Sequence, residues 1–460
     1  MRLRLATGLL AMVALGCQAS AAAAAAPQQV GTISLPGGDP TSLGVYEPDG
    51  ELYVSDDNAG EVRVFDGDTL GLIGTISGVG SSGFDMVVDQ SLGRVYVASS
   101  KHPFTTGYND GTGKVAVIDL STNAVTEVDV PDQNPVTSNF NLAHDEGRDR
   151  VYVAHSGGFG YIDDTNTFHA AMDAPVTDTT YDIGINTVAN EVYYATVEDS
   201  DPRLVIVDGD TLGLTFFDLG PTGAGAPLDF AVNEAENKVY VTMVFVPGQA
   251  EPGIMILDRD DDSHSFVGSS DLNPIAFNPA TSRLFAGVQI GTEAGILEGS
   301  TDAFTEVKLP DGGIGGIDVN ASSDNAYMAS SQMTYVMNGS LKCAQRFPSG
   351  APLRGGVVAS NVAVNQATDR AFVVNDQEQA HVKVFQDGDE VVCPPPDPGL
   401  PPFVFPDPFD LDPDDGADDD TAQGKKKKAC KKGFKLKKIK RKGKKPKKKC
   451  VKIKKKRKKR

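Results

Sequence analysis

One recurring position in the chain carries most of the oxygen chemistry that the sequence offers. It lies four residues before a repeated Asn or Asp, and its occupants are Asp85, Asn141, Asp182, Asp229, Pro274, Gly316 and Asn361. Hard cations such as Ca²⁺ bind where several carboxylate and carbonyl oxygens gather. If the fold brings these positions together, the five acidic and amide residues form a ligand-binding ring for Ca²⁺ or for a polar group of a partner. The commoner alternative is that short polar side chains cap the ends of strands.

The evidence for catalysis is mostly negative. The six histidines are scattered, at His102, His144, His155, His169, His264 and His381. The sequence has no H-E-x-x-H, G-x-S-x-G, P-loop or C-x-x-C motif. We therefore expect no catalytic residues and no cofactor apart from the Ca²⁺ considered above. The alternative function is a lactonase-like or hydrolase-like enzyme with a metal at the ring.

An eightfold repeat must position these residues. In each copy an aromatic residue follows the Asn, Asp or Glu after six or seven residues, and the aromatics stand 41 to 56 residues apart: Tyr53, Tyr96, Tyr152, Tyr193, Tyr240, Phe285, Tyr327 and Phe372. The copy from Asp229 to Asp258, with the segment that follows it, reads as four short apolar strands joined by turns. Units of about this length with four strands are the blades of a β-propeller. The sequence predicts an all-β, eight-bladed propeller, with seven blades as the alternative.

Two segments compete to complete the last blade. Residues 30–35 (VGTISL) match the fourth-strand segment 73–77 (IGTIS). A chain that opens on an outer strand closes the ring by adding that strand to the last blade, so that no blade keeps an unpaired edge. Residues 389–393 (DEVVC) are the other segment that would finish this blade.

The repeats also resemble a known family. The segment AVNEAENKVYVT, with IMILD behind it, resembles the YVTN-type β-propeller repeat, and Met243 stands where that motif has its Asn. The resemblance covers residues 30–393 approximately. It implies a secreted or surface protein of bacterial type and leaves the activity open, because the fold hosts many functions.

Loop lengths distinguish two faces of the predicted propeller. The turn between the first two strands of each repeat is nearly constant, whereas the second-to-third-strand loop varies and is long at residues 99–113 and 244–253. Variable loops on a rigid scaffold commonly carry function. We expect a protein or glycan partner on the loop face and a monomeric chain. The repeated Asp-Gly-Asp-Thr at residues 66–69 and 208–211 is interpreted as a hairpin turn with positive φ at Gly.

The amino terminus reads as an export signal. Basic residues precede a short apolar run and a stretch of small residues. Residues 1–26 are therefore predicted to be a secretory signal, with a lipoprotein signal that lipidates Cys17 as the alternative. Beyond it, no stretch is long and apolar enough to span a membrane. Export permits disulfides. Cys430 is expected to pair with Cys450, and the pairing of Cys343 with Cys393 stays open.

The net charge of −19 combines two opposed parts. The first 424 residues carry −44, and residues 425–460 carry +25 with no acidic residue. Residues 27–393 are the predicted propeller, residues 394–424 a Pro- and Asp-rich disordered linker, and residues 425–460 a basic tail. Multivalent lysines bind polyanions in a salt-dependent way. The predicted protein is a secreted or cell-surface, non-enzymatic binding scaffold, tethered by its tail to anionic envelope polymers or to a membrane surface. The alternative use of the tail is association with the acidic body of the chain.

Overall fold

The computed structural model describes the strands of the fold and many of the turns that join them. The described residues are 26–56, 59–80, 83–99, 112–131, 141–155, 158–172, 182–198, 201–219, 226–244, 253–268, 272–288, 291–309, 313–330, 333–348, 361–376, 381–388, 391–393, 434–441 and 444–452. The chain divides into two units, Met1–Phe403 and Val404–Arg460, which are considered separately. Within the described residues there is no helix, and hence none that could cross a lipid bilayer.

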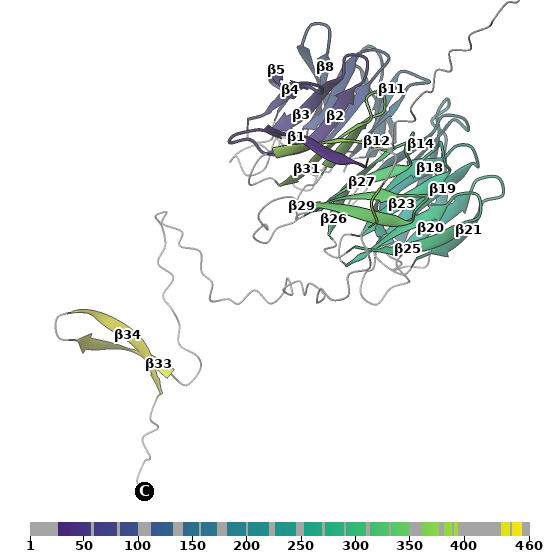
Figure 1. The fold of residues 1–460 in the computed structure, drawn as a ribbon. Helices are drawn as coiled ribbons and strands as arrows, with labels where there is room; N and C mark the ends of the chain where they lie inside the picture. The colour runs from purple at the N-terminus through teal and green to yellow at the C-terminus, as the bar shows by residue number, and fades with distance from the viewer. Residues whose placement is uncertain are drawn as a thin grey trace, which may run out of the picture. The chain divides into compact units, whose positions relative to one another are not determined.

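The first unit consists of eight four-stranded antiparallel sheets, which confirms the eight-bladed propeller (Figure 1). Blades 1 to 4 are β2 (Pro40–Tyr46), β3 (Glu51–Asp56), β4 (Glu61–Asp66) and β5 (Leu72–Ser77); β6 (Gly83–Asp89), β7 (Arg94–Ser99), β8 (Thr112–Asp119) and β9 (Ala124–Pro131); β10 (Asn141–Asp145), β11 (Arg150–His155), β12 (Gly158–Ile162) and β13 (Phe168–Met172); β14 (Ile183–Asn186), β15 (Glu191–Glu198), β16 (Asp201–Asp208) and β17 (Leu214–Asp218).

Blades 5 to 8 repeat this order, and the last blade takes one strand from the start of the chain. They are β18 (Ala226–Asn233), β19 (Lys238–Val244), β20 (Gly253–Asp258) and β21 (Ser263–Val267); β22 (Leu272–Asn278), β23 (Arg283–Val288), β24 (Glu293–Glu298) and β25 (Ala303–Lys308); β26 (Ile314–Asn320), β27 (Asn325–Ser330), β28 (Met333–Asn338) and β29 (Cys343–Pro348); β30 (Asn361–Asn365), β31 (Arg370–Asp376), β32 (His381–Gln386) and β1 (Gln28–Ser34).

The hydrophobic core lies between neighbouring blades. Eight buried clusters, one for each pair of adjacent blades, hold the fold together, and the cluster between blades 1 and 2 joins Tyr53 to Val95 and Val97. The eight repeated aromatics lie on the second strands and are at most 2% exposed. Burying a side chain of this size stabilises a fold by about 1.5–3 kcal/mol. The aromatic period in the sequence is thus the period of the inter-blade core.

The ring is closed by the amino-terminal strand. β1 pairs antiparallel with β32, from Gln28 opposite Gln386 to Ser34 opposite His381. Figure 1 shows the purple β1 beside the green strands of the last blade. The alternative in which residues 389–393 finish this blade does not occur. Val391 is instead buried in the cluster between blades 7 and 8.

A disulfide joins the end of the propeller to the preceding blade. Cys343 begins β29, the outer strand of blade 7, and it is bonded to Cys393, which follows β32 in the chain. This pairing, left open by the sequence, closes a 50-residue separation across the two blades.

The second unit contains a two-stranded hairpin. β33 (Phe434–Arg441) pairs antiparallel with β34 (Lys444–Lys452), and Leu436 lies opposite Cys450. The pairing of Cys430 with Cys450 lies outside the described residues, as do residues 1–25 with Cys17, the linker 394–424 and most of the long loops of the variable face.

Candidate functional site

The first strands of the blades form the innermost ring. Each first strand contacts the first strand of the next blade around the closed circle, including β2 against β30. The recurring position predicted to carry the ring lies in these strands, or directly before the strand in the case of Asp182. In blades 2, 5, 6 and 7 it lies at or beside a break in the pairing register, where the first strand bulges away from the second, and Ser42 lies at such a break in blade 1. A bulge leaves an inner-strand amide without its ladder partner.

A hydroxyl of the second strand satisfies that amide. In blade 5 the Asp229 N–H donates to Thr242 Oγ1 at 3.0 Å, and in blade 1 the Ser42 N–H donates to Ser55 Oγ at 2.8 Å. Thr242 is fully buried. It is also the third residue of the Tyr-Val-Thr sequence of this repeat, so the hydroxyl in the repeat has a physical role at the bulge.

The carboxylates of the recurring position connect neighbouring blades. Asp85 accepts the Met86 N–H on Oδ1 at 2.8 Å and the Leu142 N–H of the next blade on Oδ2 at 2.7 Å. Asp229 does the same with the N–H groups of Phe230, at 2.9 Å, and Ile275, at 2.8 Å. Each carboxylate therefore uses one oxygen within its own blade and the other on its neighbour. These residues are structural clasps between blades.

Asp182 follows the same pattern with one addition. Its Oδ2 accepts the Phe230 N–H of the next blade at 3.4 Å, and its carboxyl group is also hydrogen-bonded to that of Asp229. Burial raises the pKa of Asp182 well above its ordinary value, and the charge of Asp229 adds to the effect. Burial likewise raises the pKa of Asp229. Burial thus favours the protonated form of both carboxyl groups.

A fourth clasp was missed by the sequence reasoning. Asp318 of blade 7 accepts the N–H groups of Val319 and of Val364 in the next blade, both at 2.8 Å. It lies two residues further along its strand than the predicted column, whose blade-7 occupant is Gly316. Burial raises the pKa of Asp318 to about 6 and that of Asp85 to about 7. The signal available in the sequence was an acidic residue among the Gly, Ile and Val residues of the same strand.

The remaining members of the predicted ring add little charge. Asn141 and Asn361 are the first residues of β10 and β30, and Pro274 and Gly316 bring no side-chain oxygen. Among the described residues, no group of three or more His, Cys, Asp or Glu side chains is arranged to hold a metal ion. The Ca²⁺ ring stays a prediction, and the oxygens that it would need bind backbone amides.

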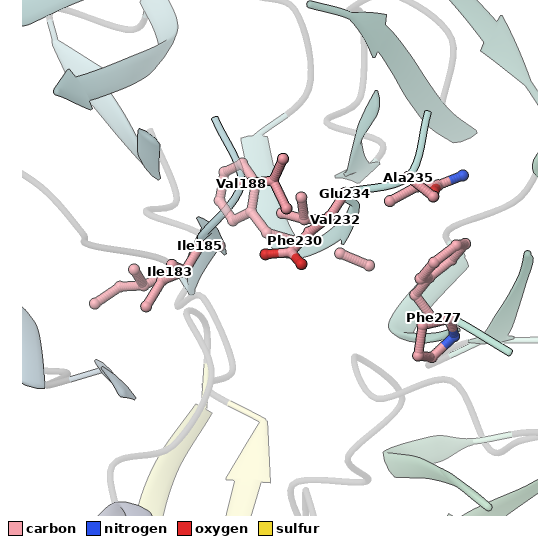
Figure 2. Close-up of a pocket in the computed structure, with 12 residues that line it drawn as sticks. Ile183, Ile185, Val188, Phe230, Val232, Glu234, Ala235 and Phe277 are labelled. Carbon is pink, nitrogen blue, oxygen red and sulfur yellow. The ribbon is translucent and has the colours of Figure 1, made fainter. Parts of the chain in front are cut away.

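A cavity of about 710 Å³ lies along the inner strands β14, β18 and β22, in the part of each strand that follows the recurring position (Figure 2). It runs from the residues after Asp182 and Asp229 to the turns that follow β14 and β18, and it reaches β22. Its walls are mostly apolar: Ile183, Ile185, Val188, Phe230, Val232 and Phe277. Glu234 is the charged residue of the lining. Nothing in the sequence analysis pointed to this cavity, which lies at the end of the constant turns.

The histidines do not form a site within the described residues. His144 and His155 lie on the neighbouring strands β10 and β11, but His144 Nε2 lies 3.2 Å from Asp89 Oδ2 and His155 packs edge-on against Phe168. His169 contacts Asp163 at 2.7 Å in an exposed hairpin of the same blade. These three histidines have separate partners, so they form no common site.

The Asp-Gly-Asp-Thr hairpins are turns, but the expected role of Gly67 was wrong. Asp66 Oδ1 accepts the N–H groups of Asp68 and Thr69, at 3.0 and 2.6 Å. The residue with positive φ is Leu70, at 60°. Gly67 is needed for a close approach, because a Cβ there would lie 2.5 Å from the Gly50 carbonyl oxygen.

Comparisons with known proteins add only to the description of the fold. No protein-family model matches the chain. No curated protein matches it either. Among solved structures it is similar to one titled Kuenenia stuttgartiensis Hydrazine Synthase, with 13% sequence identity and a TM-score of 0.49, over 68% of this chain and 96% of that chain. A likeness at this level carries no argument about activity.

Proposed function

We propose that the chain is an exported β-propeller that binds partners rather than transforming a substrate, and that its Lys-rich tail holds it on anionic polymers of the cell envelope or on a membrane surface. The observation that carries this proposal is the engagement of the inner-ring carboxylates. Asp85, Asp229 and Asp318 each use both oxygens on backbone amides of two blades. A general acid or base must be able to reach a substrate proton, and these groups are committed to the scaffold.

The composition of the tail supports the second half of the proposal. Residues 425–460 carry 25 Lys and Arg and no acidic residue. The hairpin β33–β34 gathers many of these cations in one small unit. An exported polycation meets envelope glycopolymers and anionic lipid headgroups, which it binds through many weak, salt-sensitive contacts. The resemblance to YVTN-type repeats favours the same setting, with a protein or glycan partner on the variable loops.

A hydrolase-like enzyme is the second candidate, and one observation favours it. The Asp182 and Asp229 carboxyl groups are hydrogen-bonded to each other, and burial raises the pKa of both; strongly perturbed carboxyl pairs are frequent in active sites. An inner-ring enzyme would lose its activity in Asp182→Asn while keeping its envelope binding, which separates the two proposals.

The test of the leading proposal is a pull-down of envelope components with the full chain and with a chain that ends at residue 424. The full chain should retain anionic polymers or lipids, and the shortened chain should lose them and keep any partner of the loop face. Equal retention by both chains would contradict the role of the tail.

A further inference from the structure

The residue after the recurring Asn or Asp makes a second contact between blades, and this contact differs from blade to blade. In blade 2, Gln90 Oε1 accepts the Glu47 N–H of blade 1 at 3.0 Å, and Gln90 Nε2 donates to the Val45 carbonyl at 2.7 Å. In blade 8, Gln366 makes the same pair of bonds with Ala321 N–H and the Val319 carbonyl, at 2.9 and 2.7 Å. A glutamine thus bridges the free edge of the neighbouring inner strand with one acceptor and one donor.

Blades 1, 3 and 5 have a glutamate at this position. Glu47 Oε1 of blade 1 accepts the Gln366 N–H, and of the three glutamates it is Glu234 that lines the cavity described above. Glu234 Oε1 accepts the Thr187 N–H at 2.6 Å and the Thr187 hydroxyl at 2.7 Å, which reproduces the acceptor half of the bridge. The donor half is lost, because a carboxylate has no N–H. The carbonyl that a glutamine would reach is that of Ile185, two residues before Thr187, as Val45 and Val319 stand two residues before their partners.

Ile185 has the register that makes this carbonyl an edge group. It lies opposite Val192, as Val45 lies opposite Leu52 and Val319 opposite Ala326. Glu234 Oε2 and the Ile185 carbonyl oxygen are therefore two acceptors at one place, and the described residues supply no recorded donor to Oε2. The hydrogen bonds at this place are solvent-exposed, so water reaches both acceptors. A bound N–H donor with a positive charge would replace that water and contact both acceptors at once.

The surroundings define the rest of that ligand. Both Ile185 and Glu234 line the cavity, together with Ile183, Phe230 and Phe277. Figure 2 shows the Glu234 carboxylate beside Phe230 and Val232, with Phe277 across the cavity. Its volume of about 710 Å³ falls in the range of small-molecule sites. No basic side chain lines it within the described part of the chain.

We propose that this cavity binds a small primary amine in its protonated form, with the ammonium group on Glu234 Oε2 and the Ile185 carbonyl and an apolar body against Ile183, Phe230 and Phe277. All the lining residues belong to strands β14, β18 and β22 and to the turns that follow them. It is reached from the face of the constant turns, where Val188 is 76% exposed at the rim.

Isothermal titration of the full chain with four probes of one chain length tests the proposal: n-octylammonium, n-octyltrimethylammonium, n-octanol and n-octanoate, each below its micellar concentration. The primary ammonium should bind most tightly. The trimethyl analogue lacks N–H donors and should bind at least about tenfold more weakly, because charge-assisted hydrogen bonds are lost. Equal affinity for these two probes, tighter binding of octanol or octanoate, or no binding by any probe overturns the proposal. Complete displacement of octylammonium by 150 mM (about physiological) NaCl also overturns it, since it indicates a site for inorganic cations.

The decisive variant is Glu234→Gln, which restores the bridge seen at Gln90 and Gln366. It should fold with an unchanged or raised melting temperature and bind octylammonium at least about tenfold more weakly. The matched control is Glu47→Gln, the same change at the seam of blades 8 and 1, where Glu47 Oε1 accepts the Gln366 N–H. The control should bind like the wild type, and an equal loss in both variants would refute a local site.

Val188→Lys, at an exposed rim position, gives a second test. It should weaken octylammonium binding, whereas Val188→Gln should not. Equal affinities of these two variants for octylammonium would contradict the site.

Discussion

The clasp carboxylates predict that the propeller loses stability as the pH rises from about 5 to 8. Burial raises the pKa of Asp85 to about 7 and that of Asp318 to about 6, and it also raises the pKa values of Asp182 and Asp229. In the unfolded chain these groups titrate near their ordinary value of 3.8. Between the unfolded and folded values the native state binds more protons, so raising the pH favours unfolding.

The magnitude follows from Asp85 alone. Each pH unit in this window changes the free energy of unfolding by about 1.4 kcal/mol for one proton of difference. Between about pH 5.5 and 7.5 the native Asp85 titrates partly, so its contribution over this interval is a loss of about 2 kcal/mol. In Asp85→Asn this side chain cannot titrate. Over the same pH interval, the free energy of unfolding of the variant should therefore fall by about 2 kcal/mol less than that of the wild type.

The measurement is urea unfolding followed by tyrosine fluorescence at several pH values in this range. The control is Asp66→Asn, because turn hydrogen bonds from Thr69 lower the pKa of Asp66, and its effect lies below about pH 4. That control should keep the wild-type pH dependence. If Asp85→Asn keeps it as well, Asp85 is ionised throughout this range, and burial does not raise its pKa.

Three further predictions concern the contacts that hold the blades. Thr242→Val should destabilise the fold by about 1–3 kcal/mol by leaving the Asp229 amide unsatisfied at the bulge, whereas Thr242→Ser should recover most of the loss; equal unfolding midpoints for the two variants would contradict the role of the hydroxyl. The double change Cys343→Ser and Cys393→Ser should cost about 2–4 kcal/mol by opening a 50-residue loop, which denaturant unfolding with and without reductant would measure; a wild-type midpoint for the double variant would refute it. A chain that begins at residue 36 should lose β1 and expose β32, so light scattering should detect self-association through that edge; a monomer as stable as the wild type would argue against closure by β1.

The sequence predicted the architecture because the architecture repeats. The aromatic residues from Tyr53 to Phe372 are buried in every blade. One copy of this pattern predicts little by itself, whereas its recurrence eight times at a similar spacing predicts a propeller. The match of residues 30–35 to an outer strand predicted ring closure by β1 for the same reason. The pairing of Cys343 with Cys393 could not be predicted, because it depends on where the chain runs after β32.

The repeat identified equivalent positions of the inner strands, and the role of these residues in binding a ligand stays a prediction. The partners of the Asp85, Asp182 and Asp229 oxygens depend on the local course of the backbone, which periodicity does not reveal. Glu234 was overlooked because a Glu in a polar turn is unremarkable in sequence. Its meaning comes from comparison with Gln90, which has the donor that Glu234 lacks.

The central functional claim is that the basic tail tethers the propeller to polyanions. Its most direct measurement is the affinity of the full chain and of the chain ending at residue 424 for dextran sulfate and for vesicles containing phosphatidylserine, over a range of salt concentrations. We predict that only the full chain binds and that its affinity falls by about 10³-fold or more between about 50 and 200 mM salt, as expected when several cations displace counterions. Binding of the shortened chain with equal affinity, or binding of the full chain that does not change with salt, would contradict tethering by the tail.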